Sequence, residues 1–266
     1  MKKRGLWLSL FVLGMVLLIS ACSSSASKEG EGASELGAIK EAGVLRVGAT
    51  TTGVPFTFLD TKTNQIDGVM VDVAKKVGEH LNVKVEIVQT KFSSLIPSLE
   101  ADKIDVISAG MLKTEERAKM INFSTPVYNY GEALIVPRDS EGIKTFEDLK
   151  GKTVGVQEGT TFLKAMKEQS DIKVQSYKTM ADMVVEVQNG RIDAFLADYP
   201  VMKHMINGNK SLGVKIVEDY KAQWPGDVSL GITKGADDLT KAINEAIDAM
   251  KKNGELEAII KKWNLQ

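Results

Sequence analysis

The sequence predicts a two-lobed α/β fold in which each lobe holds a mostly parallel sheet flanked by helices. Short runs of β-branched residues alternate with helix-like segments along most of the chain, which is the pattern of strand–helix–strand units. One local pattern, a basic residue followed by Ile-Asp and an apolar strand, occurs twice, at residues 103–107 and 191–195. Two units of the same plan favour two similar lobes.

Nine short segments are the candidate strands, because β-branched and apolar residues dominate them. They are residues 44–49, 83–89, 104–108, 133–136, 153–157, 174–177, 192–197, 214–217 and 229–233. Helices are predicted between them, and in residues 72–81 Val73, Val77 and Leu81 recur at the spacing of one helical face. Further helices are predicted at residues 162–168, 180–188, 199–206, 237–252 and 256–263.

The N-terminal segment has the pattern of an export signal. A basic start precedes an apolar run at residues 6–19, which is too short to span a hydrocarbon core of ~30 Å comfortably. The sequence Ile-Ser-Ala then precedes Cys22, the only cysteine of the chain, and this resembles a lipobox. We therefore expect a lipoprotein signal peptide over residues 1–21, lipidation of Cys22 and a flexible polar tether over residues 22–35. The alternatives are an ordinary secretion signal with a chance cysteine, or an uncleaved anchor.

Composition argues against several classes of function. The formal net charge of −1 over 266 residues is not the basic footprint of a nucleic-acid-binding protein. His80 and His204 stand apart and no CxxC or HExxH pattern occurs, so we expect neither a protein metal site nor a cofactor. The sequence also has no GxSxG nucleophile elbow and no GxxxxGK[ST] phosphate loop.

Two charged residues are candidates for binding a small zwitterion. Arg117 follows Thr114, a good helix N-cap, and a guanidinium beside free backbone N–H groups suits a carboxylate. The alternative is a solvated arginine paired with a glutamate. Asp198 ends a predicted strand and could bind an ammonium group, or it could cap the helix that contains Pro200. Gly110 holds the position equivalent to Asp198 in the other repeat, so both should face one crevice.

A third candidate is the strand-to-helix turn at residues 157–161. Gln157 precedes a glycine and two hydroxyl residues, Thr160 and Thr161, which together are typical of an anion-binding nest. Many ordinary helix N-termini have the same composition, so that alternative stays open. Phe92 could stack on a ligand or belong to the core.

The order of these segments resembles the family-3 extracellular solute-binding domain, which serves polar amino-acid ABC importers. The resemblance covers residues 36–266 and rests on residues 45–48, 55–56, 66–68, 72–74, 95–99, 103–107, 110–111, 114–118, 122–126, 151–157, 190–194, 253–254 and 261–263. It implies a type II periplasmic-binding-protein-like clamp with two hinge strands, matched by residues 133–136 and 229–233. Lobe 1 would comprise residues 36–132 plus 228–266, and lobe 2 residues 133–227.

The resemblance also assigns roles to the candidate residues. Arg117 occupies the position that binds the ligand α-carboxylate, and Asp198 the position that pairs with the α-ammonium. Gly110 aligns with a backbone carbonyl contact, Phe92 with one wall of an aromatic sandwich, and Thr160 with Thr161 with contacts from the second lobe.

Three positions depart from the family pattern. Thr50 stands where an acid is common, and Gly53 where an aromatic residue is common, so one wall of the sandwich is either missing or supplied by Phe56. Leu112 stands where Ser or Thr is common, which removes a hydroxyl from the carboxylate site. These departures favour a neutral ligand over a basic or acidic one.

The sequence therefore predicts a monomeric, non-catalytic binding lipoprotein outside the cytoplasmic membrane. It would hold the membrane by its lipid alone, capture an amino acid or similar zwitterion by hinge closure, and deliver it to an ABC permease with a cytoplasmic ATPase. The alternatives are a sensor-type solute binder and an enzyme on the same fold, such as a dehydratase. The roles of Glu158 and Trp224 are left open.

Overall fold

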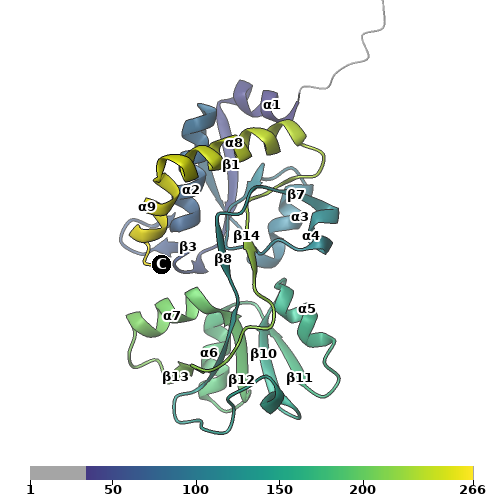
Figure 1. The fold of residues 1–266 in the computed structure, drawn as a ribbon, viewed down its shortest axis with the longest axis vertical. Coiled ribbons are helices and arrows are strands. Elements are labelled where there is room, and N and C mark those ends of the chain that lie inside the picture. The colour runs from purple at the N-terminus through teal and green to yellow at the C-terminus, as the bar shows by residue number, and fades with distance from the viewer. Residues whose placement is uncertain (1–33, 266) are drawn as a thin grey trace, which may run out of the picture. The chain divides into compact units, whose positions relative to one another are not determined.

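The computed structural model describes residues 34–265, which form the two lobes drawn in Figure 1. The expected signal peptide (1–21), Cys22 and nearly all of the expected tether (22–35) lie outside these residues. Helix α1 (Glu35–Ala42) begins at the last residue of that tether. Within residues 34–265, every helix falls short of the length and apolar character that a membrane span requires.

The sheet of the first lobe has five strands in the order β5-β1-β6-β15-β7. β1 (Val44–Ala49) lies parallel to both of its neighbours, β5 (Lys84–Gln89) and β6 (Val106–Ile107). β15 (Gly231–Thr233) is antiparallel to β6 and to β7 (Ile121–Phe123). The C-terminal part of the chain, from β15 onward, therefore returns to complete the first lobe.

The sheet of the second lobe follows the same plan in the order β11-β10-β12-β9-β13. β10 (Thr153–Gln157) lies parallel to β11 (Lys173–Tyr177) and β12 (Ala194–Asp198). β9 (Glu132–Pro137) is antiparallel to β12 and to β13 (Val214–Ile216). Two lobes of equivalent topology confirm the fold class that the repeated pattern predicts.

The repeated Ile-Asp pattern has the same structural job in both lobes. The Asp105 backbone N–H donates to the Arg46 carbonyl at 2.8 Å, and its carboxylate accepts from the Arg46 N–H at 2.6 Å. In the second lobe, the Asp193 N–H donates to the Thr153 carbonyl at 2.8 Å, and its carboxylate accepts from the Thr153 N–H at 2.7 Å. Each aspartate thus ties the start of one parallel strand to the neighbouring strand, β6 to β1 in the first lobe and β12 to β10 in the second.

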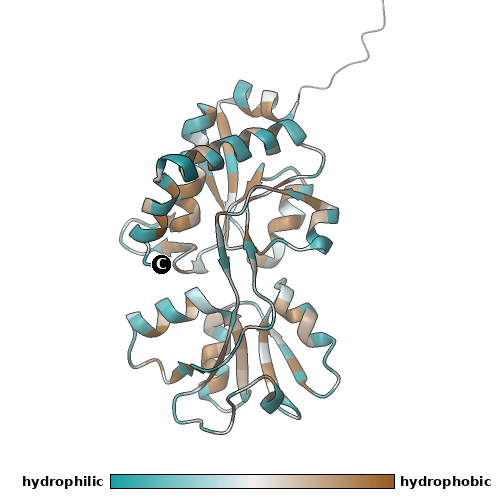
Figure 2. Cartoon of the chain, in the orientation of Figure 1, coloured by the Kyte–Doolittle hydropathy of each residue, from teal (hydrophilic) through white to brown (hydrophobic). Residues whose placement is uncertain are grey.

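Helices flank both sheets (Figure 1), and their apolar sides face the strands, as the hydropathy colours of Figure 2 show. In the first lobe they are α1, α2 (Val69–Leu81), α3 (Leu95–Glu100), α4 (Glu115–Met120), α8 (Asp237–Asn253) and α9 (Glu255–Lys262). In the second they are α5 (Thr161–Lys167), α6 (Met180–Gln188) and α7 (Tyr199–Gly208). The predicted face of α2 is buried, and Gly254, at a φ of 84°, separates α8 from α9 as predicted.

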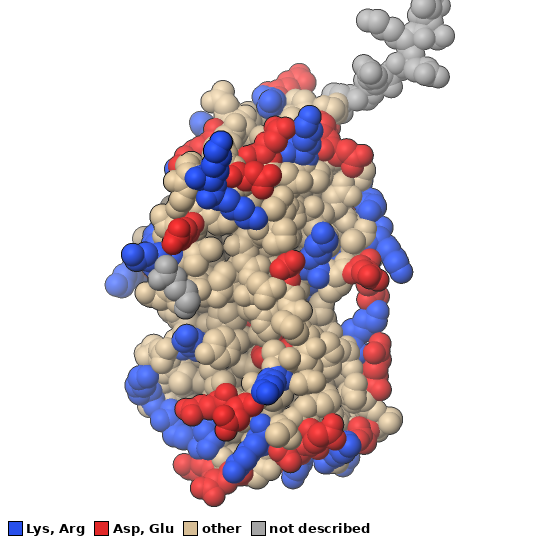
Figure 3. All heavy atoms as spheres, viewed as in Figure 1, with Lys and Arg blue, Asp and Glu red and all other residues tan. Residues whose placement is uncertain are grey.

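Several short elements have no counterpart in the sequence analysis. They are the small sheet of β2 (Thr52–Gly53), β3 (Thr57–Asp60) and β4 (Gln65–Asp67), and the 3₁₀ turns η1 (Phe92–Ser94) and η2 (Glu147–Leu149). Basic and acidic side chains are interspersed over the face shown in Figure 3, in keeping with the net charge of −1.

A two-stranded ribbon connects the lobes. β8 (Tyr128–Tyr130) pairs antiparallel with β14 (Gly226–Val228), with Tyr130 opposite Gly226, and both run from one lobe to the other in Figure 1. The segments expected to be hinge strands, 133–136 and 229–233, lie instead in and beside β9 and β15, inside the sheets. Most of their residues are buried there, whereas the connecting ribbon precedes the first segment and ends just before the second.

Candidate ligand site

A pocket lies between the lobes and is lined by residues of both. Its lining includes six of the residues that the sequence analysis selected, namely Thr50, Phe56, Phe92, Gly110, Gln157 and Asp198. The pocket therefore brings together candidate residues from both lobes.

Phe56 forms a fixed wall of this pocket. Its ring is 2% exposed, and it packs on the Tyr130 ring at 5.2 Å between centroids. A Cβ added at Gly110 would lie 2.8 Å from the Phe56 ring, so only glycine allows this close approach. Phe56 thus lines the pocket beside Gly53, the position where the family pattern commonly has an aromatic residue.

Arg117 lies behind the pocket lining and reaches across to the second lobe. Its helix α4 starts as predicted, because Thr114 Oγ1 accepts from the Arg117 N–H at 3.1 Å. Nη1 donates to the Leu112 carbonyl at 2.5 Å, and Nη2 donates to the Gly159 carbonyl at 2.8 Å. The guanidinium also lies 5.9 Å from the centre of the Phe92 ring. Arg117 is therefore not the solvated surface arginine of the alternative interpretation.

Burial is the main influence on the pKa of Arg117. Desolvation lowers the pKa of Arg117, and Tyr130, Asp198 and Glu116 oppose that change. An arginine remains protonated under such a shift, so a full positive charge is held where little water can solvate it. Such a charge favours an anionic partner.

Asp198 ends β12 and is half-buried at the edge of the pocket. It occupies the N-cap position of α7, with Pro200 in the first turn, but its side chain makes no capping hydrogen bond. Burial, reinforced by Glu132, raises the pKa of Asp198 to about 7, while the hydrogen bond from Tyr130 and the charge of Arg117 oppose the rise. The carboxylate is thus left without a helix partner, which favours the ammonium-binding interpretation.

The turn before α5 forms the opposite edge. Thr160 Oγ1 donates to the Gln157 carbonyl at 2.7 Å and accepts from the Leu163 N–H at 3.2 Å, so Thr160 is the N-cap of α5. Thr161 is the first residue of that helix and is half-buried. Neither threonine lines the pocket, whereas Gln157 does, with its Nε2 donating to the Lys178 carbonyl at 3.2 Å.

The departures from the family pattern have clear structural positions. Thr50 is 8% exposed, and its hydroxyl lies 2.7 Å from that of Thr57, which also lines the pocket. Leu112 is 4% exposed and does not line the pocket, and its contribution is the carbonyl that accepts from Arg117. Where a family hydroxyl is common, this chain thus offers a backbone oxygen that orients the arginine.

Two further contacts join the lobes beside the pocket. Glu116 of α4 forms an exposed ion pair with Lys164 of α5. Gly159, at a φ of 77°, approaches Ser93 so closely that an added Cβ would lie 2.8 Å from the Ser93 Cα. The lobes are therefore in close contact around the pocket.

Glu158 and Trp224 lie away from the pocket lining. Glu158 is half-buried, and its N–H donates to the Tyr177 carbonyl at 2.8 Å. Trp224 packs edge-on against Phe146 at 5.5 Å, and its N–H donates to Glu132 Oε2 at 3.2 Å. Both residues therefore shape the second lobe.

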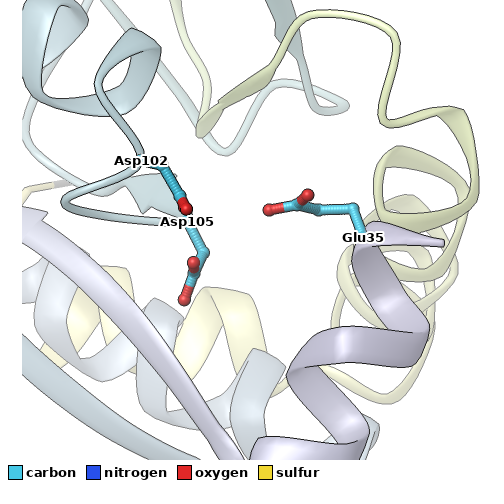
Figure 4. Close-up of side chains that lie close together, drawn as sticks. All are labelled: Glu35, Asp102 and Asp105. Atoms are coloured by element: carbon cyan, nitrogen blue, oxygen red, sulfur yellow. The ribbon is translucent and has the colours of Figure 1, made fainter. Parts of the chain in front are cut away.

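An acidic cluster lies elsewhere, in the first lobe. Glu35, Asp102 and Asp105 place one carboxylate oxygen each within 4.8 Å of one another (Figure 4). Arg46 satisfies two of them, with Nη2 at 2.7 Å from Asp102 Oδ1 and 2.5 Å from Asp105 Oδ1. The cluster therefore holds an arginine in place and is distant in function from the ligand pocket.

Sequence analysis missed part of the lining. The missed residues are Thr52, Thr57, Ala109 and Met180, together with Tyr130 just behind the lining. Met180 begins α6 directly after β11, so the rule that selected residues 157–161, a strand end followed by a helix, would have selected it too. Tyr130 gave no local signal, because only the pairing of β8 with β14 brings it to the site.

Known proteins with similar sequences and folds bind amino acids according to their names. The family model described as "Bacterial extracellular solute-binding proteins, family 3" matches residues 45–266. The ABC transporter arginine-binding protein 1 of Escherichia coli (strain K12) is 33% identical over 222 residues, which cover 82% of this chain and 90% of that protein.

Solved structures of amino-acid-binding proteins are also similar to this chain. An ancestral arginine-binding protein bound to glutamine is 38% identical with a TM-score of 0.78, covering 83% of this chain and 97% of that chain. The ancestral amino acid-binding protein AncCDT-1, a precursor of cyclohexadienyl dehydratase, is 35% identical with a TM-score of 0.79, covering 86% of this chain and 99% of that chain.

Proposed function

The chain belongs to the bacterial extracellular solute-binding proteins, family 3, and captures a solute for an ABC importer; we propose that this solute is one amino acid with a neutral, polar side chain. The observation that carries the proposal is that Asp198 of one lobe lines the pocket, while Arg117 of the other lobe lies directly behind Phe92 of that lining. Opposite charges on opposite lobes match the two ends of a zwitterion.

Arg117 binds the α-carboxylate in this proposal. Its two hydrogen bonds to backbone carbonyls use two of five N–H donors, so three remain for a carboxylate. Phe92 packs over the guanidinium and limits its movement. Thr160 and Thr161 lie at the start of α5 on the facing lobe, where a helix N-terminus adds favourable electrostatics.

Asp198 and the Gly110 carbonyl bind the α-ammonium. An ionised carboxylate and a backbone oxygen are acceptors only, as a protonated amine requires. Each charge-assisted hydrogen bond contributes about 1.5–3 kcal/mol, so two or three reach the roughly 8.2 kcal/mol of micromolar affinity once apolar burial is added. Only a closed clamp presents both ends at once, so the ligand shifts the open–closed equilibrium toward closure.

The remaining lining determines the side-chain preference. Among the described residues that line the pocket, Asp198 is the one charged side chain, and the others are neutral. With Asp198 committed to the ammonium, the hydroxyls of Thr50, Thr52 and Thr57 and the amide of Gln157 are left for the ligand side chain. A neutral polar side chain such as that of glutamine fits this set, and glutamine occupies one related ancestral protein.

The cellular setting extends the proposal. The lipobox-like sequence supports a lipid on Cys22 as the membrane anchor, with lobe 1 at residues 36–132 plus 228–266 and lobe 2 at 133–227. The partners would be a permease and its ATPase. The related proteins reported above are binding proteins by name, which supports a non-catalytic role; a sensor role is the remaining alternative.

A thermal-shift screen of the twenty L-amino acids tests the proposal, because a ligand that binds only the native state raises its melting temperature. We expect the largest rise with glutamine or another neutral polar amino acid, and a smaller one with arginine or glutamate. A largest rise with arginine would reject the neutral side-chain preference, and no rise with any amino acid would reject amino-acid binding itself.

A further inference from the structure

The Tyr130 hydroxyl lies where the two lobes and the connecting ribbon meet. Tyr130 belongs to β8, is 7% exposed, and donates to the Gly110 carbonyl at 2.7 Å. The same hydroxyl is near enough to the Asp198 carboxylate of the second lobe to lower the pKa of that group. One side chain of the ribbon thus binds one acceptor of the proposed ammonium site and influences the other.

Around the Tyr130 hydroxyl there are more hydrogen-bond acceptors than protons to donate to them. A phenol has one proton, and it faces a carbonyl and a carboxylate that are both acceptors. A primary ammonium brings three N–H donors, which matches the surplus of lone pairs at Gly110, Asp198 and the phenol itself. The Tyr130 ring is fixed by stacking on Phe56 at 5.2 Å, so the hydroxyl cannot move away without disturbing the pocket wall.

We propose that Tyr130 is a positioning residue for amino-group recognition, whose hydroxyl holds the Gly110 carbonyl in the pocket that the Asp198 carboxylate also lines and so sets the affinity of the closed form for a primary ammonium. The inference rests on the proposed function. It adds a residue of the connecting ribbon to the machinery that senses the ligand.

The electrostatics give the link a specific signature. Three ionisable groups act on Asp198: Tyr130 of β8 and Arg117 of α4 lower its pKa, and Glu132 of β9 raises it. Removing the Tyr130 hydroxyl removes an influence that favours the ionised form of Asp198, so Asp198 should ionise at higher pH. Because an ammonium needs the ionised carboxylate, the pH at which affinity is half-maximal should move with it.

The test compares two phenylalanine variants of the same strand. Tyr128 also packs against Phe56, at 5.9 Å between ring centroids. Its hydroxyl also donates to a backbone carbonyl, but to that of Leu265, at 2.9 Å, and not to that of Gly110. Both variants keep the ring and lose one hydroxyl. Calorimetry from pH 5 to 8 measures binding of whichever of the twenty L-amino acids the wild type binds most tightly.

We expect Tyr130→Phe to weaken binding about tenfold at pH 7, the size of one hydrogen bond to a charged group, and to shift the half-maximal pH upward. Tyr128→Phe should change neither value by more than about twofold. Tyr130→3-fluorotyrosine, which keeps the fold-forming ring and strengthens the donor, should shift the half-maximal pH downward.

Wild-type affinity and pH profile in Tyr130→Phe, or an equal shift in Tyr128→Phe, would overturn the inference. If Tyr130→Phe does not fold, an unchanged profile in the fluorotyrosine protein overturns it instead. Absence of binding by the wild type would reject the proposed function and this inference with it, whereas tight wild-type binding with an unaffected Tyr130 variant rejects the inference alone.

Discussion

Arg117 donates a hydrogen bond of 2.8 Å from Nη2 to the Gly159 carbonyl, so a side chain of the first lobe contacts the turn that begins α5 in the second. The proposed carboxylate-binding residue is therefore also a contact of the closed form. Ligand binding and lobe closure share one side chain, and their energies should be coupled.

Loss of the Arg117 side chain should remove binding. In Arg117→Ala the ligand carboxylate faces two unpaired carbonyls, so we expect affinity to fall more than a hundredfold, about 3 kcal/mol. Calorimetry with the best ligand of the screen measures this. Arg191→Ala is the matched control, because Arg191 forms an exposed ion pair with Glu186 within the second lobe. Retained affinity in Arg117→Ala would exclude the carboxylate role.

The Glu116–Lys164 ion pair should aid closure only weakly. Both side chains are more than half exposed, and exposed pairs contribute about 0–1 kcal/mol. Glu116→Gln should therefore lower ligand affinity less than fivefold at low salt, and the difference should vanish in molar salt because the charges are screened. A large effect that persists at high salt would show that Glu116 contacts the ligand.

Asp198 should make the ligand-free protein less stable as the pH rises. Its folded pKa of about 7 lies above the ordinary value of 3.8, so its favourable contribution is complete below about pH 4 and is lost as pH rises through 7. Asp198→Asn has no such titration. We expect its melting temperature to match the wild type at about pH 3.5 and to exceed it at pH 8, in scanning calorimetry without ligand. An equal difference at both pH values contradicts the prediction.

Asp105 should stabilise the first lobe more than Asp193 stabilises the second. The Asp105 side chain is 3% exposed and accepts from the Arg46 backbone N–H and guanidinium, whereas Asp193 is exposed. Asp105→Ala should lower the unfolding free energy by about 3 kcal/mol and Asp193→Ala by about 1 kcal/mol. Urea unfolding measures both, and equal losses would show that the arginine contributes nothing.

Cys22 should determine membrane attachment. We expect Cys22→Ala to be released into the medium or to remain unprocessed, because no thiol is present for a lipid. Cell fractionation measures the distribution, with Ser23→Ala as the neighbouring control. Processed Cys22→Ala protein that still sediments with membranes would refute the lipid anchor.

The strands of the two sheets could be predicted from the sequence because their burial requires apolar residues, and apolar runs are visible in the sequence. A buried parallel strand must be apolar, so β1 and β10 have the predicted bounds. The small sheet around Thr52 and Thr57 was not predicted, since short polar strands have no distinct composition.

The residues of the candidate site likewise divide into those that local sequence predicts and those that it does not. Asp198 was selected because a carboxylate after an apolar run needs a partner, a local argument that holds in the structure. Tyr130 and Met180 reach the site through long-range pairing, which one sequence alone does not reveal. The position of Arg117 behind the lining, bonded to the Gly159 carbonyl, depends on how the lobes meet and so lay equally beyond the sequence.

The ribbon of β8 and β14 has a mechanical consequence. Its two strands are hydrogen-bonded to each other, and at the second lobe Glu132 accepts from the Tyr220 hydroxyl at 2.8 Å and the Gln223 N–H at 2.6 Å, which ties the segment before β14 to the segment after β8. Two strands that are held together at one end bend together and resist sliding past each other. The lobes would then close by joint bending of the two strands, and the outline that a membrane partner meets would differ between the empty and the loaded protein.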